Sequence, residues 1–316
     1  LCDRRQRQMC IRDRLTPLPF YSIGEPELTK VVNKGGEEFF VLKVLVSNNS
    51  DYDGIIQMNV LQNGWWYQPL EDPRARKKVE IAAHTTKEFV SVWEEQIREV
   101  EVNTMISGNL PYMIRQSIGN VKQERNKIVK DSIYTLPESS LEMPGEIIVD
   151  NEDSTLFVLS TPPVVGLLPK WLDEVEETPF KYSGISWWRA PLQWTATTNA
   201  KYYGKYIRSA YVIKSGDGSQ TATWKIPVPE AGQYELYYYV FKNDELRWND
   251  RLQGEYHFRV AYDSEVEDAY INLRKANEGW EQLGTYYFSA DTVRVVLTDE
   301  CKLRSVTADA VKIVKR

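Results

Sequence analysis

The sequence predicts an all-β protein built from two β-sandwich domains. Aromatic residues make up 12% of the 316 residues, with 10 Trp and 19 Tyr, and aromatic side chains favour strands. Apolar residues also alternate with polar ones in many short segments that are separated by turn residues, and no helical period accompanies them. The clearest example is Trp224–Val240, which reads as strand, tight turn and strand.

This segment predicts core positions at a period of two. The turn Pro229-Glu230-Ala231-Gly232 combines a proline that fixes φ with a glycine that can take a positive φ. One side of each flanking strand is apolar or aromatic, at Trp224, Ile226 and Val228 and then at Tyr234, Leu236, Tyr238 and Val240. We therefore expect the segment to belong to the core of a small extracellular sandwich, with any binding site in the loops beside it.

Residues 20–112 are predicted to form the first domain, an immunoglobulin-like β-sandwich. Several short alternating segments occur at regular spacing, which is typical of that architecture. The two clearest segments hold Phe40, Leu42, Val44 and Val46, and then Ile56, Met58 and Val60. Trp65-Trp66-Tyr67 follows a turn and is expected to pack at the edge of the sandwich rather than to bind a ligand.

The remaining boundaries follow from changes in composition. Residues 113–145 are polar and end in a segment rich in Pro, Ser and Gly, which indicates a linker; residues 146–316 form the second domain. Residues 1–19 are expected to be artefactual or disordered, because residues 1–14 are rich in Arg and resemble a translated sequencing adapter. A basic arm or a degenerate targeting segment is the alternative. On the adapter interpretation, the chain is the C-terminal part of a longer protein.

Composition excludes several functional classes. The net charge of −6 argues against a nucleic-acid partner, and no apolar run is long enough to span a membrane. The two histidines are far apart in sequence, the three cysteines suggest no disulfide framework, and Cys301 is expected to be a structural thiol. No G-x-S-x-G, H-E-x-x-H, P-loop or C-x-x-C motif occurs. We therefore expect the chain to have no catalytic activity of its own. We also expect it to be a monomer.

The second domain resembles the carbohydrate-binding-like domain at the C-terminus of golvesin and of bacterial xanthan lyases. The motifs that carry this resemblance are Asp150-Asn151, Tyr203-Gly204-Lys205-Tyr206, Ala222-Thr223-Trp224, Pro229–Tyr234, Tyr256-His257-Phe258, Trp280–Gly284, Val295-Val296-Leu297 and Ala308–Val311. They occur in order over residues 146–316. The polar "DQ" pair of that family is missing from the run 269–274, and the irregular segment 160–200 is longer than expected.

The resemblance implies a jelly-roll or carbohydrate-binding-module-like fold in a secreted bacterial protein. An extracellular, cell-surface or periplasmic location follows, with a polysaccharide or the protein's own upstream catalytic domain as partner. The segment Val102–Pro111 of the first domain resembles β-rich regions of large Bacteroidetes membrane proteins.

Two loops are predicted to bind carbohydrate, because a flat aromatic ring can stack on a sugar while nearby polar groups bind its hydroxyls. The candidates are Trp187, Trp188, Tyr202, Tyr203, Arg247, Trp248 and Asn249. A solvated hairpin loop remains the alternative for the segment around Trp248, and Trp280, beside a family motif, is expected to pack in the core.

Asp309 shares strand parity with Val311 and Ile313, so its carboxylate should be buried and must have a partner. We expect one of two roles for this carboxylate. It accepts hydrogen bonds from backbone N–H groups, Arg or Tyr, or it is a ligand of calcium, which prefers oxygen ligands. In the second case Asp150, Asn151 and Asp153 would be the other ligands, because first and last strands often lie side by side in such folds. No other cofactor is expected.

Three functions remain open. The first is a non-catalytic accessory segment of a larger secreted or periplasmic protein, which binds carbohydrate or docks onto its catalytic part. The second is a pair of structural spacer domains. The third is a polysaccharide lyase or hydrolase, which would need two carboxylates across a cleft.

Overall fold

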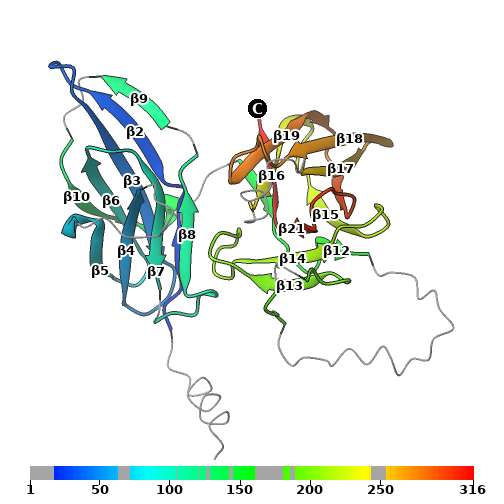
Figure 1. The fold of residues 1–316 in the computed structure, drawn as a ribbon, viewed down its shortest axis with the longest axis horizontal. Helices are drawn as coiled ribbons and strands as arrows, with labels where there is room; N and C mark the ends of the chain where they lie inside the picture. The colour runs from blue at the N-terminus through cyan, green and yellow to red at the C-terminus, as the bar shows by residue number, and fades with distance from the viewer. Residues whose placement is uncertain are drawn as a thin grey trace, which may run out of the picture. The chain divides into compact units, whose positions relative to one another are not determined.

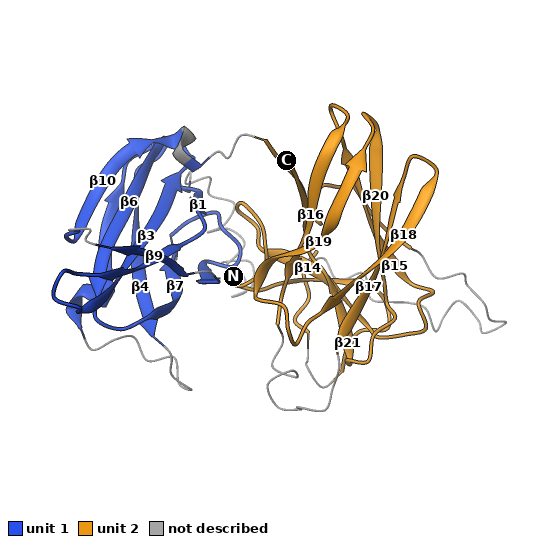
Figure 2. Cartoon of the chain, turned by 90° about the horizontal axis from the view of Figure 1, so that it is seen from above, with its two compact units in different colours: residues 1–142 blue, residues 143–316 orange. Residues whose placement is uncertain are grey.

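The computed structural model describes residues 18–62, 72–104, 106–119, 121–125, 129–141, 145–160, 181–185, 189–242 and 254–316. The chain divides into two compact units, residues 1–142 and 143–316 (Figure 2). The described residues form strands and two short 3₁₀ helices, η1 (Pro73–Ala75) and η2 (Glu138–Leu141), and contain no α-helix. The all-β class is therefore confirmed. No helix in these ranges has the length and apolar character needed to cross a membrane.

Where the structure describes unit 1, the strands form two sheets (Figure 1). The six-stranded sheet has the order β10 (Ser132–Pro137), β6 (Thr85–Trp93), β3 (Glu38–Asn48), β2 (Glu27–Val32) and β9 (Val121–Arg125), and β1 (Tyr21–Ile23) also pairs with β3. The four-stranded sheet has the order β5 (Arg76–Ile81), β4 (Gly54–Gln62), β7 (Ile97–Asn103) and β8 (Met113–Ser117). All pairs are antiparallel except β2 with β9.

Alternate side chains of both sheets meet in one apolar core. Leu42, Val44 and Val46 from β3 and Ile56, Met58 and Val60 from β4 are all buried in it. Burying each such side chain contributes roughly 1.5–3 kcal/mol. The residues that recur at every second position of these segments are therefore the residues that face the core.

The linker predicted at residues 113–145 has to be corrected. β8 pairs with β7, β9 with β2 and β10 with β6, so all three strands belong to unit 1. Each lies at the end of its sheet's strand order, and edge strands often carry polar and charged side chains that prevent further strand pairing. Their polar composition therefore indicates an edge position rather than a linker.

The described residues of unit 2 form three antiparallel sheets. The five-stranded sheet has the order β12 (Phe157–Leu159), β15 (Thr221–Pro227), β20 (Thr292–Thr298), β17 (Glu255–Tyr262) and β18 (Glu265–Asn272). The four-stranded sheet has the order β11 (Glu146–Val149), β22 (Val311–Lys315), β16 (Gly232–Val240) and β19 (Gly279–Phe288). The third contains β13 (Thr195–Thr198), β14 (Ser209–Lys214) and β21 (Ser305–Ala308). As expected, the first and last strands of the unit, β11 and β22, are neighbours.

The segment Trp224–Val240 packs in the core, as predicted, but its two strands do not pair with each other. β15 pairs with β12 and β20, whereas β16 pairs with β19 and β22. The turn between them therefore carries the chain from one sheet to the other. The Trp224 and Tyr238 rings meet edge to face across the core, with centroids 6.0 Å apart. All seven side chains predicted to face inward are buried.

Candidate functional site

The loop between β13 and β14 carries two of the predicted ligand-binding residues, Tyr202 and Tyr203. Asn199 shapes its start, because its side-chain oxygen accepts from the Lys201 N–H at 3.0 Å and its backbone carbonyl accepts from Tyr202 at 3.1 Å. Gly204 then takes a φ of +143°, and a Cβ there would lie 1.9 Å from the Ile207 carbonyl oxygen. This tight turn aims Tyr202 and Tyr203 into the protein.

Tyr202 is only 3% exposed and packs edge to face on Phe241, with centroids 4.7 Å apart. It therefore lacks the free ring face that its predicted stacking role requires, and that expectation is corrected. Tyr203 is half-buried and packs against two other rings, Tyr239 at 5.4 Å and Trp280 at 5.0 Å. The other predicted stacking and polar residues, Trp187, Trp188, Arg247, Trp248 and Asn249, lie outside the described residues.

Asp309 lies directly beneath this loop. It is fully buried, and its Oδ2 accepts a hydrogen bond of 3.2 Å from the Tyr203 N–H, while its Oδ1 has no hydrogen-bond partner among the described residues. Arg208, 5% exposed, donates through Nη1 to the carbonyl oxygens of Ala200 and Tyr202 at 3.3 and 3.2 Å. The loop is thus tied to the last strands of the unit through buried polar groups.

The turn after β11 brings Asp150 close to the same charges. Its Oδ1 accepts from the Asn151 N–H at 2.7 Å, and its own N–H donates to Asp153 Oδ2 at 2.8 Å. Glu152 accepts hydrogen bonds from Lys181, Ser209 and Tyr182. These contacts tie the turn after β11 to the start of β14.

The pKa values of the carboxyl groups in this region are shifted in different directions. Burial, and then the nearby Asp150, raise the pKa of Asp309 well above its usual range, although the Tyr203 N–H and the Arg208 charge act the other way. Burial also raises the pKa of Asp150, with further contributions from Asp153 and Glu152. For Glu152, burial is outweighed by the hydrogen bonds from Lys181, Ser209 and Tyr182, so its pKa is lowered. The pKa shifts therefore favour the ionised form of Glu152 and the neutral forms of Asp150 and Asp309.

The calcium prediction for Asp150, Asn151, Asp153 and Asp309 stays a prediction. Within the described ranges, no group of three or more His, Cys, Asp or Glu side chains could hold a metal ion. The contacts of Asp309 instead match the alternative interpretation, an acceptor for a backbone N–H close to an arginine. This arrangement holds a loop in place without requiring a ligand.

Trp280 is not a core residue, contrary to the expectation from sequence. It is half-buried and meets Tyr239 edge to face at 5.1 Å. The Lys312 ammonium lies 4.8 Å from its ring centroid and 3.0 Å from Glu146 Oε1. Lys312 therefore makes a cation–π contact with the Trp280 ring and covers part of its face.

A second aromatic group, which the sequence did not single out, lies on the outer face of the five-stranded sheet. Tyr270 on β18 stands opposite His257 on β17, and their rings stack at 4.9 Å with an interplanar angle of 10°. The Tyr270 side chain is 55% exposed. His257 alternates with the buried Tyr256 and Phe258, but the stacked pair depends on the β17–β18 register, which no local pattern reveals.

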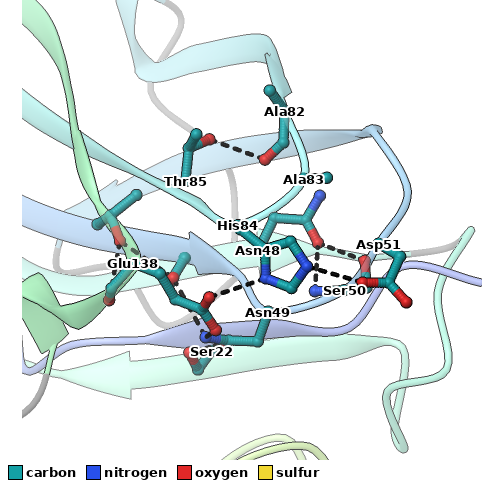
Figure 3. A network of polar contacts seen from close by, with 12 residues as sticks. Ser22, Asn48, Asn49, Ser50, Asp51, Ala82, Ala83, His84, Thr85 and Glu138 are labelled. Atoms are coloured by element: carbon teal, nitrogen blue, oxygen red, sulfur yellow. Dashed lines mark hydrogen bonds and ion pairs between the residues drawn. The ribbon is translucent and has the colours of Figure 1, made fainter.

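Unit 1 carries an exposed polar network around His84 (Figure 3). Its Nδ1 lies 2.9 Å from Glu138 Oε2 and its Nε2 lies 2.8 Å from Asp51 Oδ1. Glu138 Oε1 also accepts from Asn49 at 2.6 Å. Hydrogen bonds to Asp51 and then to Glu138 raise the pKa of His84. All of these contacts join loops at strand ends, so the network fastens η2 to the rest of unit 1.

Comparison with known proteins finds one family model that matches part of unit 2. Residues 188–315 match the family model of the Golvesin C-terminal domain. The resemblance stated from the motifs is therefore confirmed over this range, which lies within unit 2 and includes Tyr202, Tyr203, Tyr270 and Asp309. No curated protein matches the chain.

Several solved structures align with the chain at low identity and with TM-scores below 0.5. Xanthan lyase from Paenibacillus is 19% identical with a TM-score of 0.38, covering 95% of this chain and 26% of its own. A GH26-CBM35 β-(1,4)-mannanase from Podospora anserina is 12% identical with a TM-score of 0.27, covering 55% of this chain and 28% of its own. A β-glucuronidase from Bacteroides uniformis is 11% identical with a TM-score of 0.24, covering 95% and 30%. This chain thus spans less than a third of each of these three proteins.

Proposed function

We propose that the chain is a non-catalytic, carbohydrate-binding accessory segment of a larger secreted bacterial protein. In this proposal both units are β-sandwiches, the first immunoglobulin-like and the second of the jelly-roll or carbohydrate-binding-module type. The protein is monomeric and acts in the extracellular space, at the cell surface or in the periplasm. The match of residues 188–315 to the Golvesin C-terminal domain supports the accessory role.

The exposed ring of Tyr270 is the observation that carries the binding role. It stands on the outer face of a sheet, and His257 supports one side of the ring. His257 is itself held by Asp268, whose Oδ1 lies 2.8 Å from its Nε2. A ring that is fixed in this way loses little conformational freedom when a ligand binds. Aromatic faces with nearby polar groups are suited to sugar rings.

The described titratable groups support a role without catalysis. Asp150, Glu152 and Asp309 are committed to structural contacts, and His84 and His257 lie in different units and are each paired with carboxylates. A general base needs access to a substrate proton. Neither Asp309, which is fully buried, nor Glu152, which is hydrogen-bonded to three side chains, offers that access.

Affinity electrophoresis of the full chain through gels that contain neutral or acidic polysaccharides tests the proposal. We expect at least one polysaccharide to retard the protein, and Tyr270→Ala to weaken binding about fivefold or more, because an aromatic contact contributes about 1 kcal/mol. Tyr287→Ala is the matched control, since Tyr287 is also exposed, at 64%, but lies on β19.

Three results would contradict parts of this proposal. Free migration of the folded protein in every gel would remove the binding role and leave the spacer or docking functions. An equal loss in Tyr287→Ala would remove the assignment to Tyr270. Release of unsaturated or reducing sugar ends by the chain alone would show that it is an enzyme.

A further inference from the structure

Three cationic side chains gather on the same outer face that carries Tyr270. Lys225 on β15 stands directly opposite Arg294 on β20. Arg259 on β17 is paired with Val296, two residues along β20 from Arg294 and on the same face. Arg259 and Arg294 are exposed and Lys225 is half-buried. We call these three residues the basic cluster.

The basic cluster is electrostatically unfavourable in the protein by itself. Side chains directly opposite each other on antiparallel strands have Cβ atoms about 5 Å apart, and like charges at that spacing are destabilising. None of the three residues has an ion pair among the described residues. The whole chain has a net charge of −6, so a basic composition does not account for the cluster.

Two carboxylates near this face, Asp268 and Glu300, contact His257 and form no ion pair with the cluster. Asp268 stands opposite Arg259, but its Oδ1 is bonded to His257 Nε2 at 2.8 Å. Glu300 Oε2 lies 3.5 Å from His257 Nδ1, beyond the end of β20 that is remote from Arg294. The basic cluster therefore lies toward one end of the face, and the stacked rings with Asp268 and Glu300 lie toward the other.

The basic cluster and the stacked rings occupy consecutive rows of the sheet. His257 and Tyr270 form one cross-strand row, and Arg259 lies two residues along β17 in the next. Two residues of a strand span about 7 Å. A ligand that contacts both groups must therefore extend over several rows and strands, which suits a polymer better than a single small molecule.

Resting on the proposed carbohydrate-binding function, we propose that this face binds an anionic polysaccharide. A sugar ring stacks on Tyr270, and carboxylate or sulfate groups of the chain bind Arg259, Arg294 and Lys225. Guanidinium groups donate two parallel hydrogen bonds to such anions. The bound anion also relieves the repulsion between Lys225 and Arg294.

The test compares polysaccharides that differ in charge. The full chain is titrated with polygalacturonate, which carries carboxylates, with dextran sulfate and with neutral dextran. We expect the acidic polymers to bind at least about tenfold more tightly than dextran and their binding to weaken as salt rises. Binding of both acidic polymers indicates general anion recognition, and binding of one identifies its anionic group.

The variant Lys225→Gln/Arg259→Gln/Arg294→Gln is expected to lose the preference for acidic polymers. Because the substitutions remove repulsion, its thermal midpoint should equal or exceed that of the wild type in the absence of ligand. The control Lys34→Gln/Lys78→Gln/Lys130→Gln changes the net charge equally through exposed lysines of unit 1 and should bind as the wild type does.

The outcomes separate this inference from the proposed function. Equal binding of dextran and acidic polymers, or unchanged acidic binding by the basic-cluster variant, would overturn the inference and leave carbohydrate binding intact. An equal loss in the unit 1 control would show a non-specific charge effect and would also overturn it. Absence of binding to any polysaccharide would overturn both.

Discussion

Tyr203 and Asp309 lie 106 positions apart, yet the Tyr203 N–H donates a hydrogen bond of 3.2 Å to Asp309 Oδ2. The backbone carbonyl of Asp309 accepts from Trp224 Nε1 at 3.1 Å. One residue therefore joins the loop after β13 to the centre of the core. Because Asp309 is fully buried, its side chain contributes to stability through the hydrogen bond from Tyr203 and is not accessible to a ligand.

Asp309→Ala is expected to destabilise unit 2 by about 1–3 kcal/mol, because it removes the acceptor of the half-buried Tyr203 N–H. Asp309→Asn keeps that acceptor, and burial already favours the neutral form of this group, so it should cost less. Urea unfolding of the full chain, with hydrogen exchange to locate the change, measures both. Equal losses in the two variants would show that the negative charge beside Arg208 is what matters.

Gly204→Ala should be more destabilising than Gly279→Ala. Both glycines have a positive φ, +143° and +99°, but an added Cβ meets the Ile207 carbonyl at position 204 and has nothing within 4 Å at position 279. Gly279→Ala should therefore cost about 1 kcal/mol from the backbone alone. The clash adds to that cost for Gly204→Ala, and thermal unfolding of the two variants compares them directly. Similar losses would contradict the tight turn beneath Tyr203.

Local alternation predicted the core well, because it reports which side of a strand is apolar. All seven inward positions of Trp224–Val240 are buried, and the parity argument placed Asp309 correctly. Alternation does not report which strands pair. The assignment of β15 and β16 to different sheets, and of β8, β9 and β10 to unit 1, depends on contacts between distant parts of the chain.

The candidate site was less predictable for the same reason. Tyr202 looked like a loop aromatic, but the turn at Gly204 directs it onto Phe241. Tyr270 was overlooked, since its stacking partner His257 lies on another strand and becomes a neighbour only through the register of β17 and β18. Residues that meet across strands leave no signal at a fixed sequence spacing.

The stability of unit 1 should decrease as the pH rises past neutrality. Hydrogen bonds to Asp51 and Glu138 raise the pKa of His84 above its ordinary value of about 6.5. Protonated His84 is therefore favoured in the folded state, and its stabilisation is fully present below that ordinary pKa and lost as the pH rises through the folded pKa. Thermal midpoints measured between about pH 5.5 and 8 test this.

His84→Asn is the control for the pH effect, because Asn tolerates the φ of +52° at this position but does not titrate. The difference in midpoint between wild type and His84→Asn should shrink with rising pH. The carboxylates that face His84 are Asp51 and Glu138, so Glu138→Gln should weaken the dependence without abolishing it. A constant difference across the range would show that the network is not linked to protonation.

Asn109 should be a stabilising residue of unit 1. Its Oδ1 accepts from the Tyr21 N–H at 2.9 Å and its Nδ2 donates to the Tyr21 carbonyl oxygen at 2.7 Å, in a site where Tyr21 is fully buried. Asn109→Ala leaves both backbone groups without these partners and should cost about 2–4 kcal/mol. Asn33→Ala, which also removes side-chain hydrogen bonds but in an exposed turn, should cost clearly less, because water replaces the lost partners. Hydrogen exchange at β1 should rise in Asn109→Ala alone; protection of β1 equal to that of the wild type would contradict this role for Asn109.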